Sequence, residues 1–254
     1  MQAYVQQNQP AGVPPLELTG ERTLPDVPAE NYWFRRHLAV YQWIAKRVGG
    51  LRVLDMACGE GYGSDVLAQA AEEVVGVDAN PEAHDHARLR YRRPNLTFER
   101  GMVENFGQPG TFDAVVFLQT IEHVQDAEAV LGHFRRLLTP GGVAYISTPN
   151  VLTLAGPGRS KSDNPWHVRE YRAQEFDQLC RTVFGHVELL GLFHARKLRV
   201  HALALKLRWD RVHQLLRVTR PFYDRFTPAI SSRDFALHPE GLDRALDFLA
   251  VCRD

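Results

Sequence analysis

Three glycines at alternate positions, Gly59, Gly61 and Gly63, and an aspartate 19 positions after the first of them, Asp78, are the residues of this sequence best suited to bind a ligand. Glycines lack a Cβ and let the backbone approach a ligand closely. An acidic side chain at this distance can accept hydrogen bonds from both hydroxyls of a ribose. The G-x-G-x-G spacing differs from the G-x-G-x-x-G of dinucleotide-binding folds, so the pattern predicts an adenosyl ligand and disfavours a nicotinamide cofactor. The alternative is that the glycines only form a tight turn and that Asp78 only caps a helix.

A second set of residues could perform acid–base or metal chemistry: Glu122, His123 and His167. One carboxylate and two imidazoles could bind a divalent cation that acidifies an acceptor hydroxyl. Alternatively, one histidine could remove the hydroxyl proton directly as a general base. A structural or capping role is the third possibility. His167 is the better catalytic candidate of the two histidines, because it lies in an irregular polar stretch where a histidine has little reason to belong to a core.

The elements that should position these residues alternate between strands and helices. Short apolar runs bounded by turn residues predict buried strands, and helical spacing of apolar residues predicts the helices. The predicted strands are 52–56, 74–78, 96–99, 112–118, 143–147, 187–193 and 246–252, with helices at 29–48, 64–71, 80–92, 130–138 and 171–184 and a turn at 139–142. This alternation predicts an α/β fold, a doubly wound, mostly parallel, seven-stranded sheet of Rossmann-like type that binds ligands at the carboxyl ends of its strands.

The length of 254 residues fits one such domain. Residues 1–20, rich in Gln, Pro and Gly, predict a flexible N-terminal arm, and residues 21–254 predict a single domain with its cofactor-binding core at 50–150. A polar loop at about 151–170 and an insertion at about 196–243, mainly helical up to residue 220, should cover the acceptor site before the last strand is reached.

Composition limits the partners. The sequence has 30 basic and 30 acidic residues and a formal net charge of zero, so it lacks the positive field that holds a nucleic-acid backbone. Hydrophobic residues make up 44%, which supports a core, yet no run is long enough for a membrane span. The first residues do not resemble a signal peptide. The three cysteines are few and odd in number, which suits a reducing compartment. We therefore expect a cytoplasmic protein with no nucleic-acid partner and no membrane span.

Residues 50–150 resemble the class I S-adenosylmethionine-dependent methyltransferases. The resemblance is carried by 53–63, by Asp78, by the strand 112–118 with Gln119-Thr120-Ile121-Glu122-His123-Val124, and by Leu138-Thr139-Pro140-Gly141-Gly142. It implies that S-adenosyl-L-methionine is the methyl donor, with Asp78 at the ribose, Asp55 and Gly59 near the methionine part, and Gln119 near the sulfonium. Met102 stands where many relatives have an acidic residue for the adenine amino group, so backbone and apolar contacts should hold adenine. The cofactor-binding residues that the resemblance implies are Asp55, Ala57, Gly59, Gly61, Gly63, Asp78, Ala79, Met102, Val103 and Gln119.

The flanking segments 18–25, 30–37, 147–150 and 164–170 resemble a narrower group, actinobacterial methyltransferases associated with methylated polysaccharides such as methylglucose polymers. This resemblance implies methylation of a sugar hydroxyl in an oligo- or polysaccharide. Aromatic faces stack on pyranose rings, and arginine forks bind hydroxyls or carboxylates. Trp33 and Phe34 could equally be core residues, since an aromatic stripe on a helix often packs inward. The candidate acceptor-site residues are Tyr32, Trp33, Arg36, Asn150, Trp166 and Arg169.

Glu122-His123, followed by Thr148-Pro149-Asn150 and a later histidine, also resembles metal-dependent RNA 2′-O-methyltransferases and quinone O-methyltransferases. Those relatives carry another Glu where this chain has Gln119. The resemblance implies a divalent cation such as Mg²⁺ at Glu122, His123 and His167. Three functions remain open: a sugar O-methyltransferase, an O-methyltransferase of a quinone, phenol or other small metabolite, and a non-catalytic adenosyl-binding module.

Overall fold

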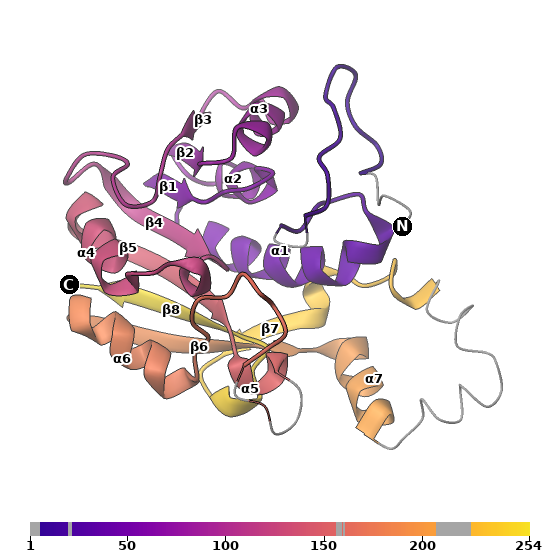
Figure 1. Ribbon diagram of the computed structural model, residues 1–254. Coiled ribbons are helices and arrows are strands. Elements are labelled where there is room, and N and C mark those ends of the chain that lie inside the picture. The colour runs from indigo at the N-terminus through magenta and orange to yellow at the C-terminus, as the bar shows by residue number, and fades with distance from the viewer. Residues whose placement is uncertain (1–5, 20–21, 156–158, 160, 207–224) are drawn as a thin grey trace.

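A single mixed sheet with helices on both faces forms the centre of the protein (Figure 1). The structure is a computed structural model, and it describes residues 6–19, 22–155, 159, 161–206 and 225–254. The strands are β1 (Arg52–Met56), β2 (Glu73–Asp78), β3 (Leu96–Arg100), β4 (Phe112–Leu118), β5 (Leu138–Pro149), β6 (His186–His194), β7 (Phe235–His238) and β8 (Asp247–Arg253). Their order across the sheet is β3-β2-β1-β4-β5-β8-β6-β7.

Strands β1 to β5 are parallel, whereas β8 is antiparallel to both of its neighbours, β5 and β6. The expected α/β fold with a mostly parallel, doubly wound sheet is confirmed. The sheet has eight strands instead of the predicted seven. The additional strand is β7, which forms within the predicted insertion and pairs antiparallel with β6 at the edge of the sheet.

The helices lie in two layers that bury the two faces of the sheet. Helices α1 (Asn31–Ala45), α2 (Tyr62–Leu67), α3 (Pro81–Arg90) and α7 (Arg196–Lys206) pack on one face, and α4 (Ala127–Leu137) and α6 (Ala173–Val183) pack on the other. Side chains alternate between the two cores, so that Val53 of β1 faces the first layer and Leu54 and Met56 face the second. Because both faces are buried, the central strands are continuous apolar runs.

Short helical pieces connect these elements: η1 (Pro28–Glu30), η2 (Ile121–His123), α5 (Val151–Leu154), η3 (Ser232–Asp234) and η4 (Leu242–Arg244). Helix α4 begins one turn earlier than predicted, because Asp126 caps it by accepting a hydrogen bond from the Ala129 backbone N–H at 2.9 Å. The predicted turn at 139–142 is instead part of β5, whose register against β4 shifts between Phe112 and Ala114. The bulge at this shift accommodates the glycine pair within the strand.

The predicted loose arm is packed over much of its described length. Gln6, Val13 and Leu16 are buried, and Leu16 forms a small apolar cluster with Leu24 and Val27. Scattered apolar side chains in this Pro- and Gly-rich segment, for which a flexible arm was predicted, thus find partners on the domain. Residues 207–224 of the predicted helical insertion lie outside the described part of the chain. No helix among the described residues is long and apolar enough to cross a membrane.

Candidate active site

A cavity of about 290 Å³ lies at the carboxyl ends of β1, β2 and β4, where parallel α/β sheets bind their ligands. Its walls come from the segment before α1, from α1 itself, from the glycine-rich loop after β1, and from the residues that follow β2 and β4. The lining residues are Arg22, Thr23, His37, Tyr41, Ala57, Cys58, Gly59, Glu60, Tyr62, Asp78, Ala83, Leu118, Gln119, Thr120 and His123. Cofactor and catalytic candidates therefore share one cavity.

Gly59 and Asp78 face this cavity as a connected pair. The Gly59 backbone N–H donates to Asp78 Oδ2 at 2.8 Å, and the Asn80 backbone N–H donates to Oδ1 at 2.9 Å. A Cβ built on Gly59 would meet nothing within 4 Å, so this glycine is open to the cavity, and its φ of +56° is one that L residues disfavour. Each Asp78 oxygen retains a lone pair for a ligand. The two residues that the sequence singled out for an adenosyl ligand thus lie in direct contact, and their binding of that ligand remains a prediction.

The other two glycines do not line the cavity. A Cβ on Gly63 would lie 2.1 Å from Cζ of Tyr41, and one on Gly61 would lie 2.8 Å from Cβ of Ala87. These positions need glycine because α2 packs closely against α1 and α3. Gly61 and Gly63 were predicted as cofactor-binding residues, and the structure gives them a packing role.

Asp55 stabilises the glycine-rich loop through contacts with the helices on either side of it. It is fully buried in β1 and accepts hydrogen bonds from Ser64 Oγ at 2.6 Å and from the Tyr41 hydroxyl at 3.2 Å. Burial raises the pKa of Asp55 to about 7, against the opposing effect of these two hydrogen bonds. Asp55 does not line the cavity; its two hydrogen bonds connect α1 and α2 to β1. Ala57, which has a φ of +57°, does form part of the cavity wall.

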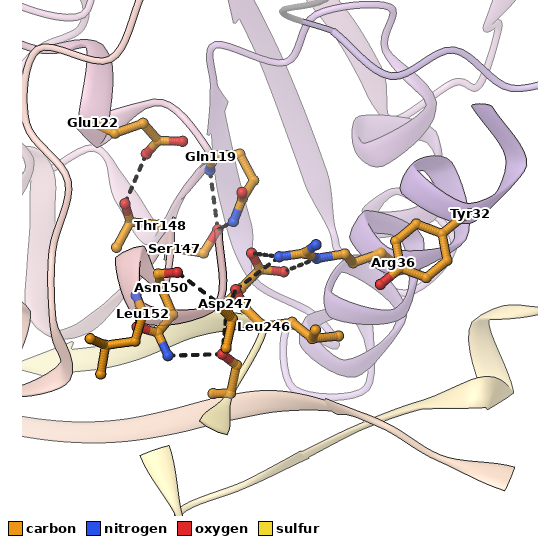
Figure 2. A network of polar contacts seen from close by, with 12 residues as sticks. Tyr32, Arg36, Gln119, Glu122, Ser147, Thr148, Asn150, Leu152, Leu246 and Asp247 are labelled. Carbon is orange, nitrogen blue, oxygen red and sulfur yellow. Dashed lines mark hydrogen bonds and ion pairs between the residues drawn. The ribbon is translucent and has the colours of Figure 1, made fainter. Parts of the chain in front are cut away.

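Of the remaining cofactor candidates, one lines the cavity and three do not. Gln119 lines the cavity with a φ of +53°, and its side-chain Nε2 donates to Ser147 Oγ at 3.0 Å (Figure 2). Ala79, Met102 and Val103 are not among the lining residues, and Met102 is 53% exposed. The cavity wall therefore includes Gln119 but stops short of the positions expected to contact adenine.

Glu122, His123 and His167 come together beside the cavity. Their potential ligand atoms all lie within 4.8 Å of one another, and His123 belongs to both the cluster and the cavity wall. Glu122 and His123 lie in η2 directly after β4, whereas His167 comes from the loop after β5. The Glu122 carbonyl oxygen accepts the backbone N–H groups of Val168 and Arg169 at 2.8 and 3.1 Å, which holds that loop against η2.

Both imidazoles are oriented by an acceptor at Nδ1. Nδ1 of His123 lies 3.1 Å from the Trp166 carbonyl oxygen, and Nδ1 of His167 lies 2.7 Å from Oε1 of Glu170. A carbonyl and an ionised carboxylate can only accept, so each Nδ1 carries the hydrogen, and in the neutral ring Nε2 keeps its lone pair. This arrangement suits either a metal ligand or a general base.

Glu170 was not predicted from the sequence. Its side chain is only 3% exposed, and besides the contact with His167 it accepts hydrogen bonds from the Ser162 backbone N–H at 2.8 Å and from the Ser162 hydroxyl. Burial alone would raise the pKa of Glu170, but the hydrogen bonds from Ser162 and His167 lower it overall. The carboxylate therefore stays ionised and fixes the orientation of His167.

Glu122 presents a carboxylate with few protein partners. It is buried, and its Oε2 accepts a hydrogen bond from Thr148 Oγ1 at 3.0 Å (Figure 2). Burial raises the pKa of Glu122 to about 8. The other carboxylate oxygen of Glu122, Oε1, lies 4.0 Å from Nε2 of His123.

Two predicted acceptor-site residues have structural roles instead. Arg36 is 5% exposed and forms a two-point ion pair with Asp247, at 2.6 Å from Nε and 2.5 Å from Nη2, which also donates to the Leu246 carbonyl (Figure 2). Asn150 is fully buried, and its Nδ2 donates to the carbonyl oxygens of 242, 243 and 245. Both side chains are therefore engaged by partners far along the chain.

The aromatic candidates remain partly accessible. Trp166 is 63% exposed and Trp33 is 40% exposed, whereas Phe34 is buried, so of the two neighbours on α1 only Phe34 is a core residue. The Tyr32 hydroxyl lies 2.8 Å from Nε2 of His194. The guanidinium of Arg169 lies 5.0 Å from the ring centroid of Tyr171.

Sequence reasoning missed the part of the wall that precedes and includes α1. Arg22, Thr23 and His37 line the cavity, although none was a candidate. Their only signal was that they fall within the segments 18–25 and 30–37 that resemble the narrower methyltransferase group.

Residues 29–203 match a family profile described as a methyltransferase domain. A probable S-adenosylmethionine-dependent methyltransferase of Mycolicibacterium smegmatis is 44% identical over 181 residues, which cover 70% of this chain and 69% of the relative. A protein of the same description from Mycobacterium tuberculosis is 36% identical over 253 residues, which cover 93% of this chain and 89% of the relative.

A ubiquinone biosynthesis O-methyltransferase of Albidiferax ferrireducens is 32% identical over 171 residues, which cover 61% of this chain and 66% of that protein. Among solved structures, an S-adenosylmethionine-dependent methyltransferase from Mesorhizobium loti superposes with a TM-score of 0.55 at 19% identity, over 84% of this chain and 98% of the other. At this level of identity the likeness concerns the fold alone.

Proposed function

Because this chain belongs to the class I S-adenosylmethionine-dependent methyltransferases, we propose that it transfers the methyl group to a hydroxyl oxygen of its acceptor. The observation that carries the proposal is the Glu122, His123 and His167 cluster, because His123 lines the same cavity as Gly59 and Asp78. A hydroxyl needs help to lose its proton during methyl transfer, and the cluster offers that help beside the donor site.

In this proposal the cavity binds the methyl donor. Asp78 accepts hydrogen bonds from the ribose hydroxyls with the lone pairs that Gly59 and Asn80 leave available. The open backbone at Ala57 and Gly59 lies against the methionine part, and Gln119 lies near the sulfonium. The left-handed conformations of Ala57 and Gln119, which are not glycines, are the kind of local strain that functional sites hold in place.

The reaction requires the acceptor oxygen to attack the methyl carbon in line with the departing sulfur. One C–O bond forms, one C–S bond breaks, S-adenosylhomocysteine leaves, and the hydroxyl proton passes to a base. The protein contributes mainly by holding the two reactants in this orientation. No covalent enzyme intermediate is needed.

We further propose that Glu122, His123 and His167 bind a divalent cation. Three donor groups within 4.8 Å and two imidazoles whose Nδ1–H groups are already engaged fit such an ion, because metal-binding histidines usually donate their second N–H to a carbonyl or carboxylate. When bound, a cation of this kind lowers the pKa of a coordinated hydroxyl. If no cation binds, His167 is positioned by Glu170 to remove the proton itself.

For the acceptor we propose a sugar hydroxyl. Trp166, whose carbonyl oxygen orients His123, is 63% exposed. Trp33 on α1 is 40% exposed, and the guanidinium of Arg36 lies 4.9 Å from its ring centroid. Exposed aromatic faces next to a reactive centre are suited to stacking on a pyranose ring.

A quinol or phenol is the second candidate acceptor. The observation that favours it is the similarity to a ubiquinone biosynthesis O-methyltransferase over 61% of this chain.

The test is methyl transfer from labelled S-adenosylmethionine to gluco-oligosaccharides, quinols and phenols, with and without a chelator and added Mg²⁺. The chain is compared with His167→Ala and with His186→Ala, a matched change at an exposed histidine. We expect transfer to a sugar that the chelator abolishes and that His167→Ala reduces strongly while His186→Ala does not. Transfer only to a quinol or phenol would reject the sugar, chelator-resistant transfer would reject the cation, and a fully active His167→Ala would reject the cluster.

A further inference from the structure

The charges of the cavity wall are unevenly distributed. Of the described residues that line it, Arg22 is the only lysine or arginine, and the acidic residues are Glu60 and Asp78. Asp78 faces the ribose in the proposal above. Glu60 is buried, and its carboxylate already accepts hydrogen bonds from Gln6 at 2.8 Å and Tyr91 at 2.7 Å. Arg22 therefore provides the positive charge of this cavity.

The methyl donor carries a matching negative charge. Its methionine part ends in a carboxylate, which loses water when it enters a cavity and must gain hydrogen bonds or a positive partner there. Arginine is the side chain best suited to this task, because its planar fork binds a carboxylate at two points.

We propose that Arg22, assisted by Thr23 and His37, binds the α-carboxylate of the methyl donor. The assignment rests on the proposed position of the donor in the cavity. It gives a role to the segment 18–25, which was notable in the sequence but had no function in the reaction.

The neighbours of Arg22 on the wall form a prepared polar surface. Thr23 Oγ1 lies 3.3 Å from Nδ1 of His37 and 3.0 Å from the hydroxyl of Tyr62, and Thr23, His37 and Tyr62 all line the cavity. Burial lowers the pKa of His37 to about 4, so the imidazole is neutral at physiological pH. His37 and Thr23 can therefore donate or accept hydrogen bonds, while the charge comes from Arg22.

Residues before and after Arg22 in the chain hold its segment against the domain. Leu24 and Val27 are buried in the small apolar cluster, and Asp26 accepts an ion-paired hydrogen bond from Arg90 of α3 at 2.7 Å. Earlier in the chain, Gln6 bonds Glu60 of the glycine-rich loop. The N-terminal segment is thus attached to the glycine-rich loop and to α3, both of which contribute residues to the cavity wall, and these contacts hold the chain on either side of Arg22.

The experiment compares a ligand that has the amino-acid part, whose carboxylate Arg22 should bind, with one that lacks this part. S-adenosylhomocysteine has the amino-acid part, whereas 5′-methylthioadenosine keeps the adenosine and the sulfur but lacks the amino acid. Binding of each is measured by calorimetry to the unmodified chain, to Arg22→Gln and Arg22→Lys, and to Arg92→Gln, a matched change at an exposed arginine outside the cavity. Thermal melting checks that each variant is folded.

We expect Arg22→Gln to weaken S-adenosylhomocysteine binding by about 10- to 100-fold, as for a lost charge-assisted hydrogen bond, and to leave 5′-methylthioadenosine binding unchanged. Arg22→Lys should restore part of the loss, and Arg92→Gln should bind both ligands normally. Unchanged S-adenosylhomocysteine binding in Arg22→Gln, or equal losses for the two ligands, would overturn the assignment.

Two further results keep the assignment separate from the proposed function. If Arg22→Gln does not fold, the test uses the unmodified chain and compares S-adenosylmethionine with decarboxylated S-adenosylmethionine, which lacks the carboxylate. The decarboxylated ligand should bind at least about 10-fold more weakly. Equal binding of the two ligands overturns the assignment. If the unmodified chain binds neither adenosyl ligand, the donor site itself has been misplaced. Normal donor binding with an insensitive Arg22 rejects only the role of Arg22.

Discussion

Replacing Glu170 by Gln removes a negative charge that lies 2.7 Å from Nδ1 of His167, without changing the size of the side chain. The amide oxygen can still accept the His167 N–H. The amide nitrogen, however, would then face a group that donates to Oε2 in the native protein, the backbone N–H of Ser162. The variant therefore weakens the support of His167 while leaving His167 itself in place.

The size of the effect follows from the burial of both partners, whose side chains are 6% and 3% exposed. A hydrogen bond to a charged group is worth about 1.5–3 kcal/mol, which corresponds to about 10- to 150-fold in an equilibrium constant. Loss of such a supporting carboxylate typically weakens metal binding by about 10- to 100-fold. We expect a decrease in cation affinity within this range.

The assay is a titration with Mn²⁺ followed by electron paramagnetic resonance, on the unmodified chain, on Glu170→Gln, and on Glu128→Gln, a matched change at an exposed glutamate of α4. S-adenosylhomocysteine affinity should stay the same in all three, because neither glutamate lines the donor cavity. Equal Mn²⁺ affinity in the unmodified chain and Glu170→Gln would refute the positioning argument. If the unmodified chain binds no Mn²⁺, the cation proposal is wrong, and the effect of Glu170→Gln on kcat then tests His167 as the base.

Further predictions concern stability. Asp247→Asn leaves the buried Arg36 without its charged partner and should cost about 3–5 kcal/mol in urea unfolding, whereas Asp177→Asn, which breaks an exposed pair, should cost at most about 1 kcal/mol. Burial lowers the pKa of His37 in the folded protein to about 4, below the usual 6.5, so its contribution to stability is complete above about pH 6.5 and is lost as pH falls toward 4. Between pH 7 and 4.5 the unmodified chain should therefore lose about 1–3 kcal/mol more than His37→Gln in urea titrations, and equal losses would contradict this. Gly63→Ala should lower the melting temperature, because the new Cβ would lie 2.1 Å from a ring atom of the α1 tyrosine, with a typical cost of about 1–3 kcal/mol. A melting temperature equal to that of the unmodified chain would show that α1 and α2 separate without penalty.

The sequence was sufficient for the central strands. The bounds of β1 and β4 match the prediction, because strands buried on both faces are continuous apolar runs with turn residues at their ends. Strand β7 was missed because only Phe235 of its four residues is buried. Its pairing with β6, not its own composition, makes it a strand.

In the site, the spacing of residues along the chain was enough to place Gly59 near Asp78. The roles of other residues depend on partners that are distant in the sequence. Asp78 and Gly59 could be placed together because Asp78 ends β2 and Gly59 follows β1, its parallel neighbour. Nothing local distinguishes Gly59 from Gly63, whose need for glycine comes from the ring of Tyr41. The sequence did not reveal the ion pair of Arg36, which was a candidate for the acceptor site, because its partner Asp247 lies 211 positions away.

Glu170, the carboxylate that orients His167, was not predicted for a different reason. Glu170 lies within a polar stretch that the sequence predicts only as a loop, and its role depends on the orientation of that loop.

The position of β8 between β5 and β6 has a consequence for biosynthesis. Of the eight strands, β8 is made last, yet it lies inside the sheet and pairs with both neighbours. Until it leaves the ribosome, β5 and β6 each lack a partner on the side that β8 will occupy, and open strand edges of this kind promote aggregation. Asp247, which neutralises the buried Arg36 of α1, arrives at the same time. We therefore expect the native sheet to close only after translation of β8, slowly because its contacts with β5 span about 100 residues of chain, and nascent chains to depend on chaperones until then.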